Sequence, residues 1–461
     1  HDNGLISIPR SIIELTMTNQ FNQLITPGSL PPSLTILSLG QSFNQPIAPG
    51  TLPDTLTSLA FGESYNHNIT VGVLPASITH LTLFGTEPPQ LKAWPRSLLT
   101  LVYGIAQPIK SDTLPSTLTS LSLVAKYNHD IIPNTLPPSL TRLVLCNPDY
   151  KQQIKSWILP GELTDLIVMS EHGQFESDAL PASLSSLTIS GVTKSNFVHF
   201  PASITALSLS YKFNNTITMG WLPRSLTILT LGNMFDQVIE VGALPMTLTV
   251  LDIGDRYDRT IVKGLLPPGL RSLSLGARFN QPIEELPQSL TSLCLGNDLL
   301  HTLPTSNLVA LKTLSFNNNC RHFERVINST PSVEVVYIGG MVLPCYISPI
   351  TPHLKELHVS GTSTSALTPG HMLEVLHRVV ANVYNVQTYS ITIKRRGFMM
   401  NGGMSTGGHV STPLSIIHYR AIDNDHGLLI LENKSATSST VTVQSISIVH
   451  QSILLRFDAI I

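Results

Sequence analysis

The stretch LPPSLTILSLGQSFNQPIAPGTLPDTLTSLAFG, residues 30–62, contains one phrase twice and decides the fold. A closely similar stretch, LPPGLRSLSLGARFNQPIEELPQSLTSLCLG, occupies residues 266–296. An apolar residue before proline opens each unit, and these markers recur mostly every 20 to 23 residues, most often every 22. Such a period predicts a solenoid, in which a unit buries its apolar side only by stacking on its neighbours. The markers are Ile8, Leu30, Leu52, Leu74, Trp94, Leu114, Leu136, Leu159, Leu180, Phe200, Leu222, Leu244, Leu266, Leu286 and Leu303.

Each unit carries a short segment with the period of a β-strand. In LTILSL, residues 34–39, the apolar Leu37 and Leu39 alternate with a serine. We therefore expect one parallel strand per unit, with the leucines of successive strands forming continuous columns in the core. Pro-Gly pairs at 27–28 and 49–50 lie in the rest of the unit and exclude a long helix there. The fold is predicted to be mainly β.

The return path of each unit has its own recurring residues, an aromatic side chain followed by Asn or Asp and then by Ile. The pentapeptide FNQPI at 43–47 and at 279–283 is the clearest case. We expect the ring to fill the space beneath the return path, the Asn or Asp to bond turn backbone, and the Ile to close the core. FNQPI is therefore interpreted as architecture and not as a catalytic motif. The aromatic positions are Phe21, Phe43, Tyr65, Tyr127, Phe213, Phe235, Tyr257 and Phe279.

With these motifs the chain resembles the FNIP repeat proteins, a branch of the leucine-rich repeats with a Phe-Asn-x-x-Ile core, found in social amoebae and some giant viruses. The resemblance covers roughly residues 5–306, and the Phe-Asn core is degraded at 84–106, 146–158, 170–179 and 190–200. It implies a leucine-rich-repeat-type solenoid, with the parallel sheet on its concave face and little helix on its convex side. It also implies a role in protein interaction and no enzymatic residues.

The pattern divides the chain into three parts. Residues 1–306 are assigned to the repeat solenoid, and residues 307–360 to divergent closing repeats, because LKTLSF, VEVVYI and LKELHV keep the strand alternation. Residues 361–461 are predicted to form a small α+β C-terminal domain that caps the solenoid. Its expected elements are an amphipathic helix over 369–384 and strands at 389–400, 414–422, 427–432 and 440–457.

Composition and charge exclude several classes of partner. A net charge of −2 and a pI near 6.8 give no general attraction to nucleic acid or to anionic membranes. No apolar run reaches the length of a membrane span, so membrane insertion is not expected. Only 12% of residues are charged, whereas Ser and Thr make up about a fifth of the chain. The surface is therefore expected to consist mainly of hydroxyl groups.

The sequence contains no recognisable catalytic or metal-binding motif. Four cysteines are too few for a disulfide framework, although Cys320 and Cys345 could pair, with unpaired thiols as the alternative. The histidines form no HxH or HExxH pattern, and the serines lack a nucleophile-elbow context, so no catalytic residue, metal or cofactor is assigned. Lys394-Arg395-Arg396 are placed on an edge strand, where their charges would prevent strand-to-strand aggregation. The N-x-S/T triplets at Asn68, Asn214, Asn328 and Asn433 are expected by chance in this composition.

The outward-facing residues of the predicted sheet offer a surface for a partner. These residues occupy the third and fifth places of each strand segment and are mostly small hydroxyl side chains. Two patches mix apolar groups with charge, which is typical of partner-binding surfaces. The alternative for the charges of the first patch is an ordinary surface ion pair. The first patch is Arg142, Val144, Asp165 and Ile167, and the second is Ile228, Val250 and Asp252.

These observations predict a non-enzymatic scaffold that presents a concave, Ser/Thr-rich β-sheet to a protein partner. The alternative is a structural or surface protein of an extracellular or viral assembly, which packs through its repeat faces and so self-associates. A cytoplasmic location is favoured, with an extracellular or virion-surface location as the alternative.

Overall fold

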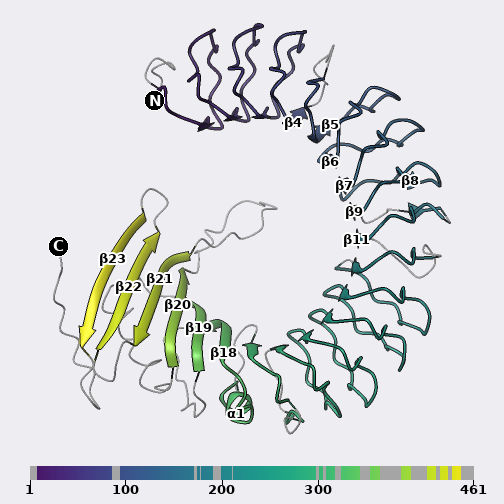
Figure 1. The fold of residues 1–461 in the computed structure, drawn as a ribbon, viewed down its shortest axis with the longest axis vertical. Helices are drawn as coiled ribbons and strands as arrows, with labels where there is room; N and C mark the ends of the chain where they lie inside the picture. Colours follow the sequence, from purple (N-terminus) through teal and green to yellow (C-terminus); the bar gives the residue numbers. More distant parts are fainter. Residues whose placement is uncertain are drawn as a thin grey trace, which may run out of the picture. The chain divides into compact units, whose positions relative to one another are not determined.

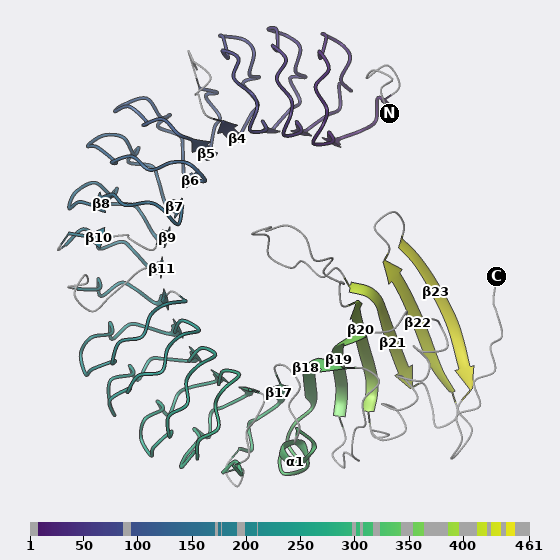
Figure 2. The same ribbon diagram turned by 180° about the vertical axis from the view of Figure 1, so that it is seen from behind.

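The computed structural model describes residues 8–85, 94–170, 174–176, 178–190, 199–209, 211–296, 301–304, 308–316, 323–342, 354–363, 386–395, 413–421, 426–434 and 439–447. Two compact units can be distinguished. The first unit comprises His1–Asn215 with Gly220–Thr227, and the second comprises Thr216–Met219 with Ile228–Ile461. The first unit and the first part of the second are stacks of coils, and each coil places one strand in a sheet along one side of its stack (Figures 1 and 2).

The first unit contains one parallel sheet, to which each coil contributes one strand. Consecutive strands pair in parallel register throughout. A second, two-stranded parallel pair, β8 (Gln153–Ile154) and β10 (Gln174–Phe175), lies on the return path. The sheet strands are β1 (Glu14–Thr16), β2 (Ile36–Ser38), β3 (Ser58–Ala60), β4 (His80–Gly85), β5 (Thr100–Ile105), β6 (Ser120–Val124), β7 (Arg142–Cys146), β9 (Asp165–Met169), β11 (Ser186–Ile189) and β12 (Ala206–Leu209).

The second unit begins in the same way and ends differently. Its strands are parallel from β13 to β20, and the last three strands then continue the sheet in antiparallel pairs. Among the described residues the α-helix is confined to α1 (Phe323–Asn328). The strands are β13 (Ile228–Thr230), β14 (Val250–Asp252), β15 (Ser272–Ser274), β16 (Ser292–Leu295), β17 (Thr313–Phe316), β18 (Val335–Val342), β19 (Leu354–Ser363), β20 (Val386–Arg395), β21 (Pro413–Ala421), β22 (His426–Lys434) and β23 (Ser439–Ser447).

The predicted leucine columns are confirmed as the core of both units. In the first unit, Leu37, Leu59 and Leu81 occupy matching places on paired strands and are almost fully buried. In the second unit, Leu229 and Leu251 do the same. The neighbours of these leucines within each strand point outward and are at least partly exposed. The fold is therefore the predicted mainly β, leucine-rich-repeat-type solenoid with little helix.

The predicted aromatic residues form a stacked ladder beneath the return path. The rings of Phe43 and Tyr65 are parallel within 4°, with centroids 6.1 Å apart, and both side chains are buried. The Asn after the ring can bond the neighbouring coil, and the Asn22 side chain accepts a hydrogen bond from the Asn44 backbone N–H at 2.8 Å. An Asp at this place does the same, as Asp258 does for Asn280. These side chains therefore join coil to coil.

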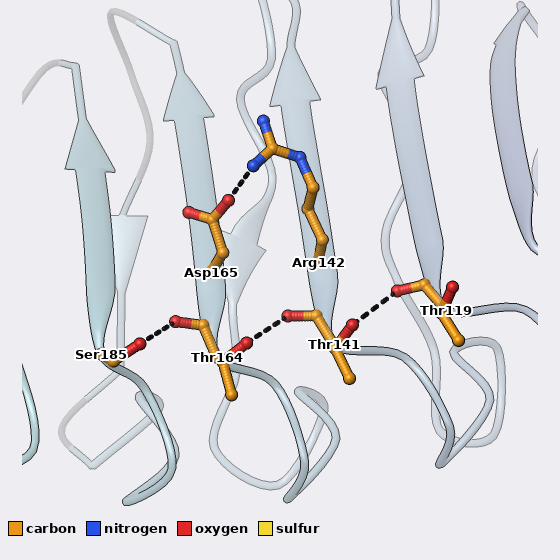
Figure 3. Close-up of polar contacts among 6 residues, drawn as sticks. All are labelled: Thr119, Thr141, Arg142, Thr164, Asp165 and Ser185. Atoms are coloured by element: carbon orange, nitrogen blue, oxygen red, sulfur yellow. Dashed lines mark hydrogen bonds and ion pairs between the residues drawn. The ribbon is translucent and has the colours of Figure 1, made fainter.

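Two rows of hydroxyl groups hold successive coils together beside the sheet. Thr141 donates a hydrogen bond to the Thr119 carbonyl, and Thr164 donates one to the Thr141 carbonyl, each at 3.2 Å (Figure 3). Two residues before Thr141, Ser139 donates a hydrogen bond to the Leu118 carbonyl at 2.7 Å. The recurring SLT of the sequence therefore places a buried leucine between two coil-linking hydroxyls.

In most of the described coils, the return path turns through a residue with a positive φ. This residue lies three places after the inward Ile, and it is Gly28, Gly50 and Gly72 in the first coils. Glycine is common at such places because its missing Cβ allows the left-handed conformation. Farther along the first unit, the residues at this place are Asp112, Asn134, Trp157 and Asp178, with φ values from 56° to 62°.

Other sequence expectations have mixed outcomes. The predicted strand segments 389–400, 414–422, 427–432 and 440–457 each overlap one of the strands β20 to β23, which begin one to three residues earlier. The edge-strand placement of Lys394 and Arg395 is wrong, because β20 pairs with β19 on one side and with β21 on the other. The predicted helix, Cys320 and Cys345 lie outside the described residues. The domain boundary at residue 361 stays a prediction, and β19 runs through it.

Candidate partner-binding surfaces

The outward face of the sheet is mostly flat and polar. In β6 the outward residues are Ser120 and Ser122, and in β11 they are Ser186 and Thr188. Small hydroxyl side chains of this kind offer a partner little apolar contact area and no charge. The strands between them, β7 and β9, interrupt this surface.

The first patch is assembled as the sequence predicts. Arg142 pairs in register with Asp165, and Val144 pairs with Ile167 on the same face of β7 and β9. The Arg142 guanidinium forms an ion pair with the Asp165 carboxylate across the two strands (Figure 3). The Arg142 side chain remains 48% exposed and that of Asp165 22%. Such an exposed pair contributes less than about 1 kcal/mol to stability, so its charges remain available to a partner.

The first patch also extends one row beyond the predicted residues. Cys146 and Met169 are register partners on the same face, with their sulfur atoms 3.8 Å apart. The Met169 side chain is well exposed. The sequence signal was the further alternation in RLVLC and DLIVM, which continues past the fifth place. The first patch therefore contains three rows, one charged and two apolar.

The second patch is smaller, and one of its residues has a role in the fold. Ile228 pairs in register with Val250, and Asp252 lies two residues farther along β14. Ile228 is exposed. The Asp252 carboxylate accepts a hydrogen bond from the Gly254 backbone N–H at 3.0 Å, at a residue with a φ of 85°. Asp252 therefore stabilises a turn, whether or not it contacts a partner.

A third cluster, in the closing repeats, was not predicted. The rings of Tyr337 and His358 stack with centroids 4.4 Å apart, and the His358 Nε2 lies 2.9 Å from a Glu356 carboxylate oxygen. In VEVVYI and LKELHV the strand alternation places Tyr337 and His358 on the outward face, so the signal for this cluster is present in the sequence. Nearby, Lys312 and Lys355 both bond Glu334, and these bonds lower the pKa of Glu334 to about 2.

The described residues show neither a metal-binding group nor, in the groove of the second unit, an acid–base pair. No group of three or more His, Cys, Asp or Glu side chains in this part of the chain could hold a metal ion. A groove of about 470 Å³ between coils of the second unit is lined by leucines and prolines, and Glu285 is the one titratable side chain in its lining. A lone carboxylate provides no acid–base pair. Within the described residues, no helix is long and apolar enough to span a membrane.

Comparisons with known proteins agree with this geometry. The sequence model of the family described as FNIP Repeat matches five times, over residues 4–42, 43–85, 127–168, 213–256 and 257–298. Among solved structures, the chain is similar to CroV588, a giant-virus protein described as a novel circular LRR protein structure, with 31% identity and a TM-score of 0.57. The match covers 78% of this chain and 61% of that protein, so this chain spans about three fifths of its relative's length. No curated protein matches. The chain therefore carries FNIP repeats in a leucine-rich-repeat-like solenoid.

Proposed function

We propose that this FNIP repeat chain is a non-enzymatic scaffold that binds a protein partner through the outward face of its parallel sheet. The first patch carries the proposal. It offers an arginine and the exposed Met169 beside the half-buried Val144 and Ile167, and arginine and methionine are enriched at interfaces. Hydroxyl side chains on both sides surround it, as a polar rim surrounds the centre of an interface.

The register of the sheet explains why these residues are better suited to a partner than to the fold. Arg142 and Asp165 continue a row that consists of Ser120 before them and Ser186 after them. The side chains of this row face away from the leucine core, so the coils do not require an ion pair here. A larger and charged group at such a place contributes little to stability and much to recognition.

The decisive experiment replaces patch residues by those of neighbouring coils. In Arg142→Ser with Ile167→Thr, each new side chain matches one already present on an adjacent strand, Ser120 and Thr188. Partners are captured with the wild-type chain and purified, and their dissociation constants are measured for both chains. We expect the double variant to bind about tenfold more weakly or worse, because truncation of central interface residues costs 1 kcal/mol or more each.

Val71→Ser is the matched control, since Val71 is an exposed apolar residue on the return path of the same unit. Equal affinities of the wild type and the double variant would contradict the assignment of the first patch. The native mass of the purified chain distinguishes the scaffold from the alternative of a structural protein that self-associates. If the wild-type chain forms a stable homo-oligomer and the double variant is monomeric, the first patch mediates self-association, and the structural alternative holds instead of the scaffold.

A further inference from the structure

Trp157 departs from the other residues that occupy its place in the coils. It has a φ of 59°, in the left-handed region where the other described coils of the first unit have Gly, Asn or Asp. Glycine, asparagine and aspartate accept this conformation readily, whereas a bulky side chain is disfavoured there by contact between Cβ and the backbone. Gly, Asn or Asp at this place would therefore allow the turn with less backbone strain than Trp157 does.

The indole of Trp157 gains no compensating burial within the described chain. Its side chain is 80% exposed, the largest exposed fraction among the exposed large apolar residues that the structure describes. Strained backbone that carries a large exposed ring indicates a functional constraint more than a packing one. Tryptophan is also the residue most enriched at interface hot spots.

The coils next to that of Trp157 carry exposed apolar residues on one side and a carboxylate on the other. The pairing of β8 with β10 advances the register by 21 residues, which places Asp178 at the same position one coil on, about 4.8 Å away along the stack. One coil back lie Ile132, with an exposed fraction of 45%, and the exposed Pro133. Along the stack, the place of Trp157 is thus preceded by Asn134, which follows these exposed apolar residues, and is followed by an acid.

The charges around Trp157 leave Asp178 available. Lys155 is paired with Asp130 at 3.6 Å. The Glu176 carboxylate accepts a hydrogen bond from the Ser156 backbone N–H at 2.9 Å and so caps the turn of the preceding coil. Among the described residues, no ion pair or hydrogen bond engages the Asp178 carboxylate. Among the described side chains near this turn, Lys155 is thus outnumbered by the carboxylates of Asp130, Glu176 and Asp178.

We propose that Trp157 and Asp178 form a docking site for an arginine side chain of a partner protein, on the return-path side of the first unit. A guanidinium is planar, so it can stack on the indole face and donate hydrogen bonds to a carboxylate at the same time. A lysine ammonium group stacks less well on the indole face, because it is a compact and strongly hydrated charge. The site is separate from the outward face of the sheet and does not depend on it.

The probe is a fluorescein-labelled octapeptide of alternating Arg and Ser, and its binding to the full chain is measured by anisotropy. Alternating Lys/Ser and Glu/Ser peptides serve for comparison. Trp157→Asn removes the ring and supplies a residue that already occupies this place at Asn134. Asp178→Asn removes the carboxylate. Asp112→Asn removes an equal charge from the same row two coils from Trp157, and is the matched control.

We expect Trp157→Asn and Asp178→Asn each to weaken binding of the Arg/Ser peptide about two- to fivefold or more, and Asp112→Asn to leave it unchanged. The Lys/Ser peptide should bind less tightly, and the Glu/Ser peptide should not bind. The Tm of Trp157→Asn should rise, because the left-handed turn is relieved of a bulky residue. The proposal is overturned by equal losses in Asp178→Asn and Asp112→Asn, by equal binding of the Lys/Ser and Arg/Ser peptides, or by a lower Tm in Trp157→Asn.

Discussion

Replacing Leu121 with alanine tests the leucine column in the middle of the first unit. Leu121 is fully buried in β6, as are its register partners Leu101 and Leu143. The change removes three carbon atoms whose burial contributes about 0.8 kcal/mol each, or roughly 2.4 kcal/mol. The flanking strands are held by ladder hydrogen bonds and cannot close the gap, so a cavity adds roughly 1 to 2 kcal/mol. We expect a total loss of about 3 to 4 kcal/mol.

The assay is amide hydrogen exchange followed by mass spectrometry on the full chain. A coil in a solenoid touches only its neighbours, so the loss of protection should concentrate on the coils that contain β5, β6 and β7. Ser122→Ala is the control, because Ser122 faces outward from the same strand and should change stability by less than about 0.5 kcal/mol. If L121A keeps wild-type protection in these coils, or if S122A loses as much, the column is misplaced.

Three further perturbations test the aromatic ladder, the asparagine row and the lysine-bridged glutamate. Burial raises the pKa of Tyr65 and Tyr257 to about 12, so their contribution to stability is complete below pH 10 and is lost as the pH rises toward 12. Replacing both with phenylalanine, which occupies this place at Phe43, should flatten the alkaline loss of Tm, and melts from pH 8 to 12 that keep the wild-type slope would contradict this. Asn44→Ala should cost roughly 0.5 to 1.5 kcal/mol in urea unfolding, because the Asn66 N–H loses its acceptor, whereas Asn44→Asp keeps it and should cost less. The lowered pKa of Glu334 gives a contribution that is present above about pH 4.5 and lost as the pH falls toward 2, so Glu334→Gln should reduce the acid dependence of the Tm over that range.

The parts of the fold that repeat could be predicted from the sequence. Leu37, Leu59 and Leu81 recur at one spacing, and that spacing alone places them on top of one another when the coils stack. The ring ladder of Phe43 and Tyr65 follows in the same way. The coil-linking role of Thr141 could not be derived, because it depends on whether a carbonyl of the preceding coil lies within hydrogen-bonding distance of the hydroxyl. In the sequence, such threonines are indistinguishable from residues that cover the surface.

One candidate surface could likewise be predicted from the repeat spacing, and the other could not. Arg142 and Asp165 could be placed side by side because their separation equals one repeat. The role proposed for Trp157 could not be predicted from the sequence, because nothing in its chemistry distinguishes it there from an ordinary exposed residue. What sets Trp157 apart is its positive φ, and the structure is needed to show that it occupies the same turn as Gly28, Gly50 and Gly72.

The geometry of a solenoid separates the effects of the three sets of variants. Leu121 faces the stacked core, so its truncation should lower stability and affect binding only through unfolding. Arg142 and Ile167 face outward, so replacing them with the residues of neighbouring strands should lower affinity at constant stability. Trp157 lies in a turn that favours smaller residues, and its replacement should lower affinity while raising stability. General misfolding lowers both quantities together, so it cannot produce these three outcomes at once. Their joint observation would therefore assign recognition to the outward sheet and to the return path independently.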